Sequence, residues 1–335
     1  MSNGSWIRES LKKYSRRHPK LLKMFQASRE KIKEREFAAC QRENPVDENL
    51  VVFESYWGKS YSSSPRAIYE GMLRDSRFEN YRFIWSFEDV QAHQYLLGNP
   101  RTSLVKRNSR EYHQAFARAK FWIYNMSVPE YMTPQEEQIY VETWHGTPLK
   151  RVGCDTIYES DYRRSREDTI AAFEKKGAKV DYLLSPSVFY DQVITTAFGL
   201  ERSHNEKAVV HTGYPRNDYL YRYDPKDREE IRRKLGIPEG KKLLLYTPTW
   251  RENQYSDQGK FTYHTELDLE KLFEILGEDY LLLYRSHHHV SSYDLSPNYQ
   301  SQVMDVTKVE DINELYIISD MLITDYSSTL FDYGN

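Results

Sequence analysis

Short apolar runs alternate with helix-forming segments from residue 50 to residue 324. The apolar runs are typical of buried strands, and the charged segments between them begin with serine, aspartate or proline, as helices do. This alternation predicts βαβ units and therefore a parallel sheet with helices on both faces. It constrains the fold more than any other feature, because parallel strands need long crossover connections and cannot form from hairpins alone.

The predicted elements fall into two series, which we expect to form two α/β lobes. The first series has strands at 50–53, 81–87, 103–106, 121–124, 139–143, 181–185 and 208–212, and helices at 64–73, 88–97, 109–119 and between the last two strands. The second has helices at 225–236, 267–276 and 312–318 and strands at 243–246, 280–284 and 321–324. A turn-rich segment, 213–218, separates them. We therefore divide the chain into an arm (1–45), an N-terminal lobe (46–218) and a C-terminal lobe (219–335).

Composition indicates a soluble globular protein, with 39% hydrophobic and 29% charged residues. The two cysteines, Cys40 and Cys154, provide neither a disulfide framework nor metal-ligand spacing, which favours a reducing compartment. No run approaches the roughly 18 apolar residues of a membrane span. We also expect no secretory signal, because no short apolar segment with a cleavage site follows the start.

The first 42 residues are strongly basic. They carry a net charge of +8, whereas the whole chain carries −3. Apolar residues recur near helical spacing, and His18-Pro19 is expected to split the arm into two helices; the apolar positions are Trp6, Ile7, Leu11, Tyr14, Leu22, Phe25 and Ile32. Such a basic amphipathic arm can lie on an anionic membrane. The alternatives are a solvated arm or a helix that packs on the body. Nucleic acid fits poorly, because the body is acidic and has no recognition module.

A histidine follows the fifth predicted strand. His145 stands between the apolar run 139–141 and Gly146-Thr147-Pro148, a turn that can open a helix. Ligands of open α/β sheets bind at this end of the strands, and an imidazole titrates near neutral pH. His145 is therefore a candidate general base, with a structural histidine as the alternative. Gly146, Thr147 and Lys150 are candidate acceptor-side residues, although Lys150 is equally compatible with contact to water alone.

Arg285 and His287 follow the apolar run 281–284. A spacing of two places both side chains on one side of a continuing strand. A guanidinium beside an imidazole can clamp a diphosphate, so Arg285 is a candidate donor-binding residue and His287 a second catalytic candidate. His288 and His289 come next, but adjacent residues in a strand point to opposite faces. We therefore expect those two at the surface and no metal site.

Polar side chains also close two other strands of the second series. Ser327 and Ser328 follow the strand 321–324, where hydroxyls and free N–H groups at a helix start can hold phosphate. Asp325 is expected to cap the helix or to bind polyol hydroxyls, because a carboxylate repels phosphate. Thr249 and Arg251 follow the strand 243–246, and the Arg251 guanidinium can bind phosphate. The alternatives are a plain helix cap and, for Arg251, a surface ion pair.

The order of these segments resembles a known family. The segments are Trp144-His145-Gly146-Thr147-Pro148-Leu149-Lys150, Tyr246-Thr247-Pro248-Thr249-Trp250-Arg251, Arg285-Ser286-His287 and Ile323-Thr324-Asp325-Tyr326-Ser327-Ser328. Together they resemble the CDP-glycerol glycerophosphotransferase family, the enzymes that build teichoic acids and related phosphopolyol polymers. The resemblance covers most of residues 50–335.

This resemblance implies the GT-B fold, with an acceptor-side lobe at 46–218 and a nucleotide-donor lobe at 219–335, and transfer of glycerol phosphate or ribitol phosphate. It also implies that Thr249 and Arg251 lie at the donor cleft. The donor would be CDP-glycerol or CDP-ribitol, the acceptor a hydroxyl of a lipid-linked teichoic acid or capsule precursor, and CMP the leaving group. His145 would take the acceptor proton, while Arg285 and His287 would steady the donor diphosphate. No cofactor or metal is required, because positive side chains can replace one. A lipid-linked acceptor favours a peripheral protein on the cytoplasmic face of the cell membrane, bound through residues 1–42.

The chain departs from the family pattern at two places. His288 differs from the usual residue after Arg285-x-His287, and the family continues beyond Asn335. We therefore expect an incomplete C-terminal lobe, which would favour a homo-oligomer or completion by a partner. Two other functions stay open: a sugar-nucleotide-dependent glycosyltransferase of the same fold, and a catalytically weak membrane-bound scaffold. Release of CMP rather than UDP or GDP would distinguish phosphopolyol transfer from glycosyl transfer.

Overall fold

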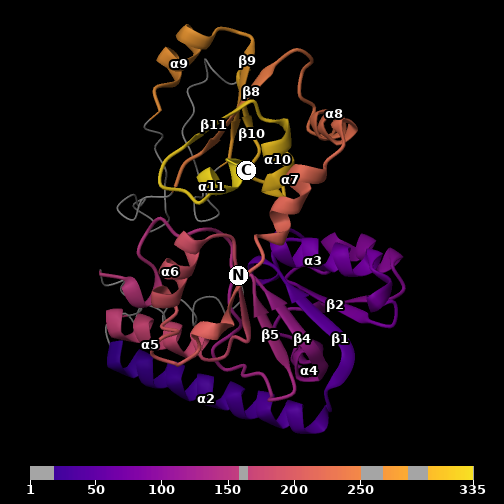
Figure 1. Ribbon diagram of the computed structural model, residues 1–335, viewed down its shortest axis with the longest axis vertical. Coiled ribbons are helices and arrows are strands. Elements are labelled where there is room, and N and C mark those ends of the chain that lie inside the picture. The colour runs from indigo at the N-terminus through magenta and orange to yellow at the C-terminus, as the bar shows by residue number, and fades with distance from the viewer. Residues whose placement is uncertain (1–18, 158–164, 250–266, 286–300, 335) are drawn as a thin grey trace, which may run out of the picture.

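The computed structural model describes residues 19–157, 165–249, 267–285 and 301–334, with side chains from residue 27 onward. Two parallel sheets form the framework (Figure 1), each at the centre of one lobe. The N-terminal lobe contains a seven-stranded sheet in the order β3-β2-β1-β4-β5-β6-β7. The C-terminal lobe contains a four-stranded sheet in the order β10-β9-β8-β11. The parallel α/β fold predicted from the alternation is thus confirmed.

The N-terminal lobe follows the predicted order of elements. Its strands are β1 (Asp47–Glu54), β2 (Arg82–Phe87), β3 (Thr102–Lys106), β4 (Ala119–Tyr124), β5 (Ile139–Glu142), β6 (Tyr182–Ser185) and β7 (Val209–His211). Its helices are α2 (Pro19–Glu43), α3 (Ser63–Arg74), α4 (Arg110–Arg118), α5 (Arg166–Gly177) and α6 (Val188–Ala197). The sequence reading missed α5, and the predicted helix 88–97 is a run of 3₁₀ turns, η3 (Gln91–Gly98).

The C-terminal lobe and its connection use shorter elements. The connection contains η6 (Pro215–Asn217) and α7 (Asp218–Arg222), and the lobe contains α8 (Pro225–Lys234), β8 (Lys242–Thr247), α9 (Leu269–Leu276), β9 (Tyr280–Tyr284), β10 (Val303–Asp305), α10 (Ile312–Ile318), β11 (Met321–Thr324) and α11 (Thr329–Tyr333). The edge strand β10 was not predicted, because three residues carry too little periodicity. Asp224 and Pro225 start α8 through a capping box, as the sequence indicates.

Each sheet has a position where the strand order reverses. In the large sheet β1 lies between β2 and β4, and in the small sheet β8 lies between β9 and β11. Loops diverge on either side of such a position and leave a crevice at the carboxyl ends of the strands, where ligands bind. The loops after β1, β4, β5, β8 and β11 therefore define where a site can form.

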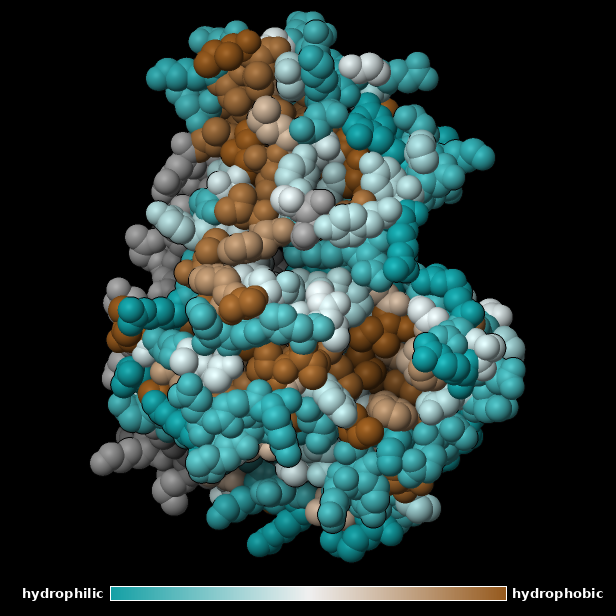
Figure 2. Space-filling model, viewed as in Figure 1, coloured by the Kyte–Doolittle hydropathy of each residue, from teal (hydrophilic) through white to brown (hydrophobic). Residues whose placement is uncertain are grey.

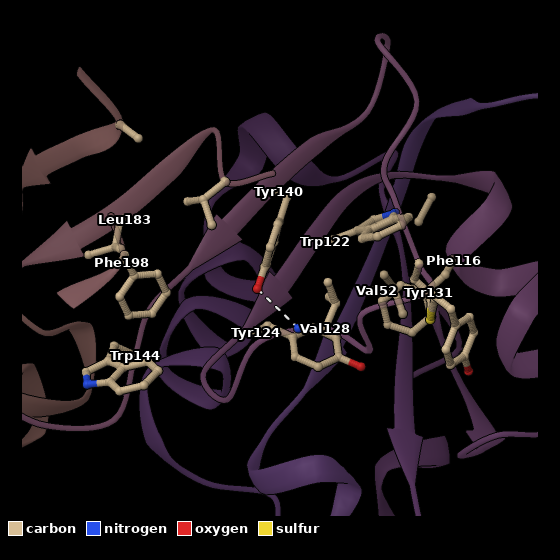
Figure 3. Packing of buried hydrophobic residues seen from close by; sticks show 14 of the residues in the cluster. Val52, Phe116, Trp122, Tyr124, Val128, Tyr131, Tyr140, Trp144, Leu183 and Phe198 are labelled. Carbon is tan, nitrogen blue, oxygen red and sulfur yellow. Dashed lines mark hydrogen bonds between the residues drawn. The ribbon is translucent and has the colours of Figure 1, made fainter. Parts of the chain in front are cut away.

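Both faces of the large sheet are buried. Leu50 and Val52 of β1 pack in one apolar cluster, whereas Val51 and Phe53 pack in another on the opposite face. Figure 3 shows part of the first cluster, in which the tyrosine hydroxyl of Tyr140 accepts a hydrogen bond from the Val128 N–H (3.3 Å). Strands that are covered on both sides need continuous apolar runs, which explains why the sequence predicts them so clearly.

Helix α2 packs along the N-terminal lobe at its lower edge in Figure 1. Phe37 is buried in the main cluster, with its ring against Trp122 of β4 and His113 of α4. Ile32, which belongs to the predicted apolar face of the arm, is instead exposed. This lower edge is mainly hydrophilic (Figure 2). Over residues 27–43 the arm is therefore a helix that packs on the body.

The start of α2 agrees with the predicted break at His18-Pro19, because Pro19 is its first residue. Proline is favoured in the first helical turn, where its missing N–H has no intrahelical acceptor. Residues 1–18 lie outside the described residues. Among the described helices, none is both long and apolar enough to cross a membrane.

Replacement of Phe37 tests the packing of α2. We expect Phe37→Ala to lower the free energy of unfolding by about 3–5 kcal/mol, because it removes a buried aromatic ring. Ile32→Ala is the control, since Ile32 is on the same helix but 54% exposed. The measurement is urea denaturation of both variants. Equal small effects would mean that α2 does not pack on the lobe in solution.

Candidate active site

The carboxyl ends of strands from both lobes border one cleft of about 640 Å³. The residues that line it include Tyr56, Trp57, His145, Arg216, Thr249, Arg285, Ser327 and Ser328. They come from the loops after β1, β5, β8, β9 and β11 and from the connection between the lobes. Because both crevices created by the strand order open here, this cleft is the candidate active site.

His145 is oriented by a main-chain carbonyl of the neighbouring strand. Its Nδ1 lies 2.8 Å from the carbonyl oxygen of Asn125, directly after β4. A carbonyl oxygen only accepts hydrogen bonds, so Nδ1 carries the proton and, in the neutral ring, Nε2 keeps a free lone pair. Burial lowers the pKa of His145 to about 4, and the positive charge of Arg216 acts in the same direction. The imidazole is therefore a neutral acceptor at neutral pH.

Asn125 joins the three loops around this histidine. Its side-chain oxygen accepts the N–H of Tyr56 (2.8 Å), and its amide nitrogen donates to the Ser55 hydroxyl (3.1 Å), both in the loop after β1. Its carbonyl holds His145 in the loop after β5. One fully buried amide thus fixes the loops after β1, β4 and β5 relative to one another.

The Glu142 carboxylate supports the same arrangement through three hydrogen bonds. One carboxylate oxygen accepts the N–H of Trp144 (2.9 Å), and the other accepts the N–H of Ser127 (2.9 Å) and the Tyr140 hydroxyl (2.7 Å). Trp144 (φ 54°) and Ser127 (φ 63°) are both in the left-handed region, which is unfavourable for residues other than glycine. These hydrogen bonds stabilise the strained turns that carry His145 and its partner Asn125. Burial raises the pKa of Glu142 to about 7.

Gly146, next to His145, lies directly against the C-terminal lobe. A Cβ atom built on Gly146 would lie 2.3 Å from the hydroxyl oxygen of Ser328. Any side chain here would therefore push the loop after β11 away from the loop after β5. The contact brings the predicted serine segment of one lobe against the predicted histidine segment of the other.

The two C-terminal-lobe turns are tied together by Asp325. One of its carboxylate oxygens accepts both the N–H (3.0 Å) and the hydroxyl (2.8 Å) of Thr249. Asp325 thus positions Thr249, which lines the cleft together with Ser327 and Ser328. We predicted a cap or a polyol contact for Asp325, whereas its described partner is the turn after β8.

Arg285 also lies where the sequence predicts. It follows β9 and lines the cleft, and its Nη1 donates to the carbonyl oxygens of Val306 (3.3 Å) and Val309 (2.6 Å). Carbonyl partners are neutral, so they orient the guanidinium without cancelling its charge. Burial lowers the pKa of Arg285 from its usual value, but an arginine stays protonated at neutral pH.

The sequence did not predict a role in the site for Arg216. It only placed this residue in a turn between the lobes. Arg216 is 4% exposed, and its Nη2 donates to both carboxylate oxygens of Asp332 in α11 (3.0 and 2.9 Å). Asn217 donates to the same carboxylate. The only signal for this role was an arginine within a Gly-Tyr-Pro-Arg-Asn turn, a pattern that indicates a loop rather than a buried ion pair.

The remaining candidate residues either do not line the cleft or lie outside the described residues. Thr147 is buried and Lys150 is exposed in a different groove, which Leu149 and Arg151 also line. Arg251 and His287 lie outside the described residues. Within the described ranges, no group of three or more carboxylate, imidazole or thiol side chains is arranged to hold a metal ion.

Comparisons with known proteins identify related chains. Residues 36–335 match the model of the family described as CDP-Glycerol:Poly(glycerophosphate) glycerophosphotransferase. A teichoic acid poly(glycerol phosphate) polymerase of Staphylococcus epidermidis is 39% identical over 310 residues, which are 91% of this chain and 42% of that protein. A teichoic acid glycerol-phosphate transferase of Staphylococcus aureus is 34% identical, over 86% of this chain and 72% of that protein.

Solved structures of the wall teichoic acid polymerase TagF have the same fold. One superposes with a TM-score of 0.79 at 35% identity, covering all of this chain and 78% of that chain. Another is a histidine-to-asparagine variant soaked with CDPG. This chain therefore spans less than half of the polymerase from S. epidermidis and about three quarters of the TagF chains.

Titration of His145 tests its environment. We expect its imidazole signals to stay constant from pH 8 to pH 5 and to titrate with a midpoint near 4, because burial disfavours the charged ring. The measurement is NMR of the imidazole groups, with His145→Gln used to assign the signal. A midpoint near 6.5, the usual value for histidine, would contradict the buried environment.

Replacement of Glu142 tests the support of the histidine loop. Glu142→Gln puts an amide donor opposite either the Trp144 N–H or the Ser127 N–H, and we expect a loss of roughly 1–3 kcal/mol in the free energy of unfolding. Because folding raises the pKa of Glu142 from 4.5 to about 7, its contribution is greatest below pH 4.5 and is lost as the pH rises through 7.

The measurement is urea denaturation of wild type and variant between pH 4.5 and pH 8. Glu137→Gln, at an exposed position of the preceding loop, is the control. A difference between wild type and Glu142→Gln that grows with pH would contradict the raised pKa.

Proposed function

Because this chain belongs to the CDP-glycerol:poly(glycerophosphate) glycerophosphotransferase family, we propose that it transfers glycerol phosphate from CDP-glycerol to a hydroxyl of a teichoic-acid-type polymer. The solved TagF variant that was soaked with CDPG supports CDP-glycerol as the donor. The first of the relatives, with 39% identity, is a poly(glycerol phosphate) polymerase, which favours glycerol over ribitol.

The reaction exchanges one phosphorus–oxygen bond for another. The acceptor hydroxyl attacks the phosphorus that carries glycerol, and the bond from this phosphorus to the bridging oxygen of CMP breaks. The hydroxyl proton passes to a base, and CMP leaves with the bridging oxygen. Catalysis needs a base near the hydroxyl and positive or N–H groups around the phosphate oxygens, whose charge otherwise repels the nucleophile.

His145 is the base in this proposal. Its Nδ1 proton is committed to the Asn125 carbonyl, so the neutral ring accepts through Nε2. Its low pKa keeps it unprotonated at neutral pH, and the ring becomes a cation only while the hydroxyl is attacking. That cation forms beside a diphosphate, whose negative charge favours it.

The donor side is supplied by the C-terminal lobe. Arg285 and the hydroxyl groups of Thr249, Ser327 and Ser328 are the proposed contacts of the diphosphate, and all four line the cleft. His287 and Arg251 remain proposed donor-side residues by their place in the family segments. The single observation that carries the proposal is the approach of Ser328 to Gly146, which puts this phosphate-binding segment beside the base.

The fold type and the location in the cell are also part of the proposal. The paired sheets and the cleft between them support a GT-B-type fold, with the division near residue 218. A polymer acceptor that is linked to lipid would bring the protein to the cytoplasmic face of the cell membrane, with residues 1–42 as the contact. The net charge of +8 in those residues supports binding to anionic lipid.

The test is release of CMP. We expect CMP from CDP-glycerol in the presence of a poly(glycerol phosphate) acceptor, and at least a 100-fold lower rate with His145→Gln, because general-base catalysis contributes about 10²–10⁴-fold. CDP-ribitol is tested in parallel. His211→Ala is the matched control, since His211 is the last residue of β7 in the same sheet and does not line the cleft.

Either of two outcomes would contradict the proposal. Full activity of His145→Gln would remove His145 from the base role. Release of UDP or GDP from a sugar nucleotide, with no CMP from either donor, would instead identify a glycosyltransferase.

A further inference from the structure

The N-terminus of α3 opens into the cleft without a capping group. Ser62 precedes the helix, but its hydroxyl contacts the Ser60 hydroxyl (2.7 Å) and accepts nothing from the first turn. This turn contains no acidic residue. Ser62, Ser63 and Ser64 are all buried, and the first two line the cleft. A buried helix start without a capping side chain needs a partner from outside the helix, and an anion is the preferred one.

A second, independent feature of the cleft is a guanidinium nitrogen of Arg216 without a hydrogen-bond partner in the ranges that the structure describes. The Nη2 of Arg216 is bonded to Asp332, whereas its Nη1 has no hydrogen-bond partner among the described residues. Arg216 is 4% exposed and lines the cleft with Ser62 and Ser63, and the short helix that carries it packs on α3. A buried guanidinium nitrogen without a partner is costly, so this atom also indicates a missing acceptor.

A third polar group in the cleft also lacks a hydrogen-bond partner among the described residues. The hydroxyl of Tyr316, which also lines the cleft, has no partner within the described part of the chain. Tyr316 is on α10, and its hydroxyl interacts electrostatically with Asp332, Arg216, Arg285 and Tyr56. The N-terminus of α3, the Arg216 guanidinium and the Tyr316 hydroxyl thus line the same cleft, and Arg216 connects this group to α11 through Asp332.

We propose that the N-terminus of α3, Arg216 and Tyr316 form a second anion site, which binds a phosphate of the acceptor. This inference rests on the proposed function. In a polyol phosphate polymer, the attacking hydroxyl is on a terminal polyol whose other end is esterified to phosphate. A site for that phosphate would hold the hydroxyl near His145. The diphosphate of the donor is assigned to Arg285 and to the hydroxyls of Thr249, Ser327 and Ser328, so the two substrates would use different polar groups of one cleft.

A carboxylate introduced at each helix start in turn distinguishes the two proposed phosphate sites. Ser62→Asp places a carboxylate at the start of α3, which favours the helix but repels phosphate. Ser62→Asn keeps the capping ability without the charge. Ser327→Asp introduces the same carboxylate at the start of the other segment. The probe is sn-glycerol 3-phosphate, with uncharged glycerol as the control, measured by isothermal titration calorimetry.

We expect wild type and Ser62→Asn to bind glycerol 3-phosphate with dissociation constants that agree within threefold. Ser62→Asp should bind at least tenfold more weakly without a lower melting temperature, and Ser327→Asp should retain binding. The proposal is overturned if Ser62→Asp binds like wild type, or if Ser327→Asp alone loses binding, which would place the probe in the donor site. A wild-type chain that binds neither glycerol nor glycerol 3-phosphate would also overturn it.

Kinetics provide a readout that distinguishes this proposal from the proposed function. If CMP is released, Ser62→Asp should raise KM for a poly(glycerol phosphate) acceptor at least tenfold while KM for CDP-glycerol changes less than threefold. If no CMP is released by wild type, the binding experiment still decides whether the anion site exists.

Discussion

The buried ion pair between Arg216 and Asp332 determines how the two lobes are arranged around the cleft. Arg216 lies in the connection between lobes and Asp332 in the last described helix, and both side chains are less than 8% exposed. The main-chain carbonyl of Arg216 also accepts a hydrogen bond from Asn313 of α10 (2.6 Å). Removing one partner of such a pair costs about 3–5 kcal/mol, because the other charge stays buried and unpaired. The connection is therefore fixed to two helices of the C-terminal lobe.

This constraint explains the contact between the lobes beside His145. Asp332 belongs to the helix that directly follows Ser327 and Ser328, so holding Asp332 also holds these serines. At the opposite side of the cleft, Glu310 accepts the N–H of Tyr61 and contacts His93 (3.0 Å). Attachment at both sides leaves little freedom for the lobes to shift, which is why Gly146 can tolerate no side chain against Ser328.

Much of the fold was predictable, because both sheets are covered on both faces and their strands need unbroken apolar runs. His145, Arg285, Ser327 and Ser328 were also predictable, since they directly follow such runs. Arg216 and Glu142 were not. Arg216 becomes part of the site only through Asp332, 116 residues later, and Glu142 reads as the end of a strand. Contacts between distant segments leave no periodic pattern, so local sequence reasoning cannot find them.

The two cleft arginines differ in how much of their charge a ligand can use, because their hydrogen-bond partners differ. Asp332 neutralises Arg216 through one nitrogen, whereas Arg285 is held by carbonyl oxygens that leave its full charge available. More uncompensated positive charge is therefore available to a ligand at Arg285 than at Arg216. A diphosphate carries more charge than a single phosphodiester, so this difference favours the donor diphosphate at Arg285 and the acceptor phosphate at Arg216.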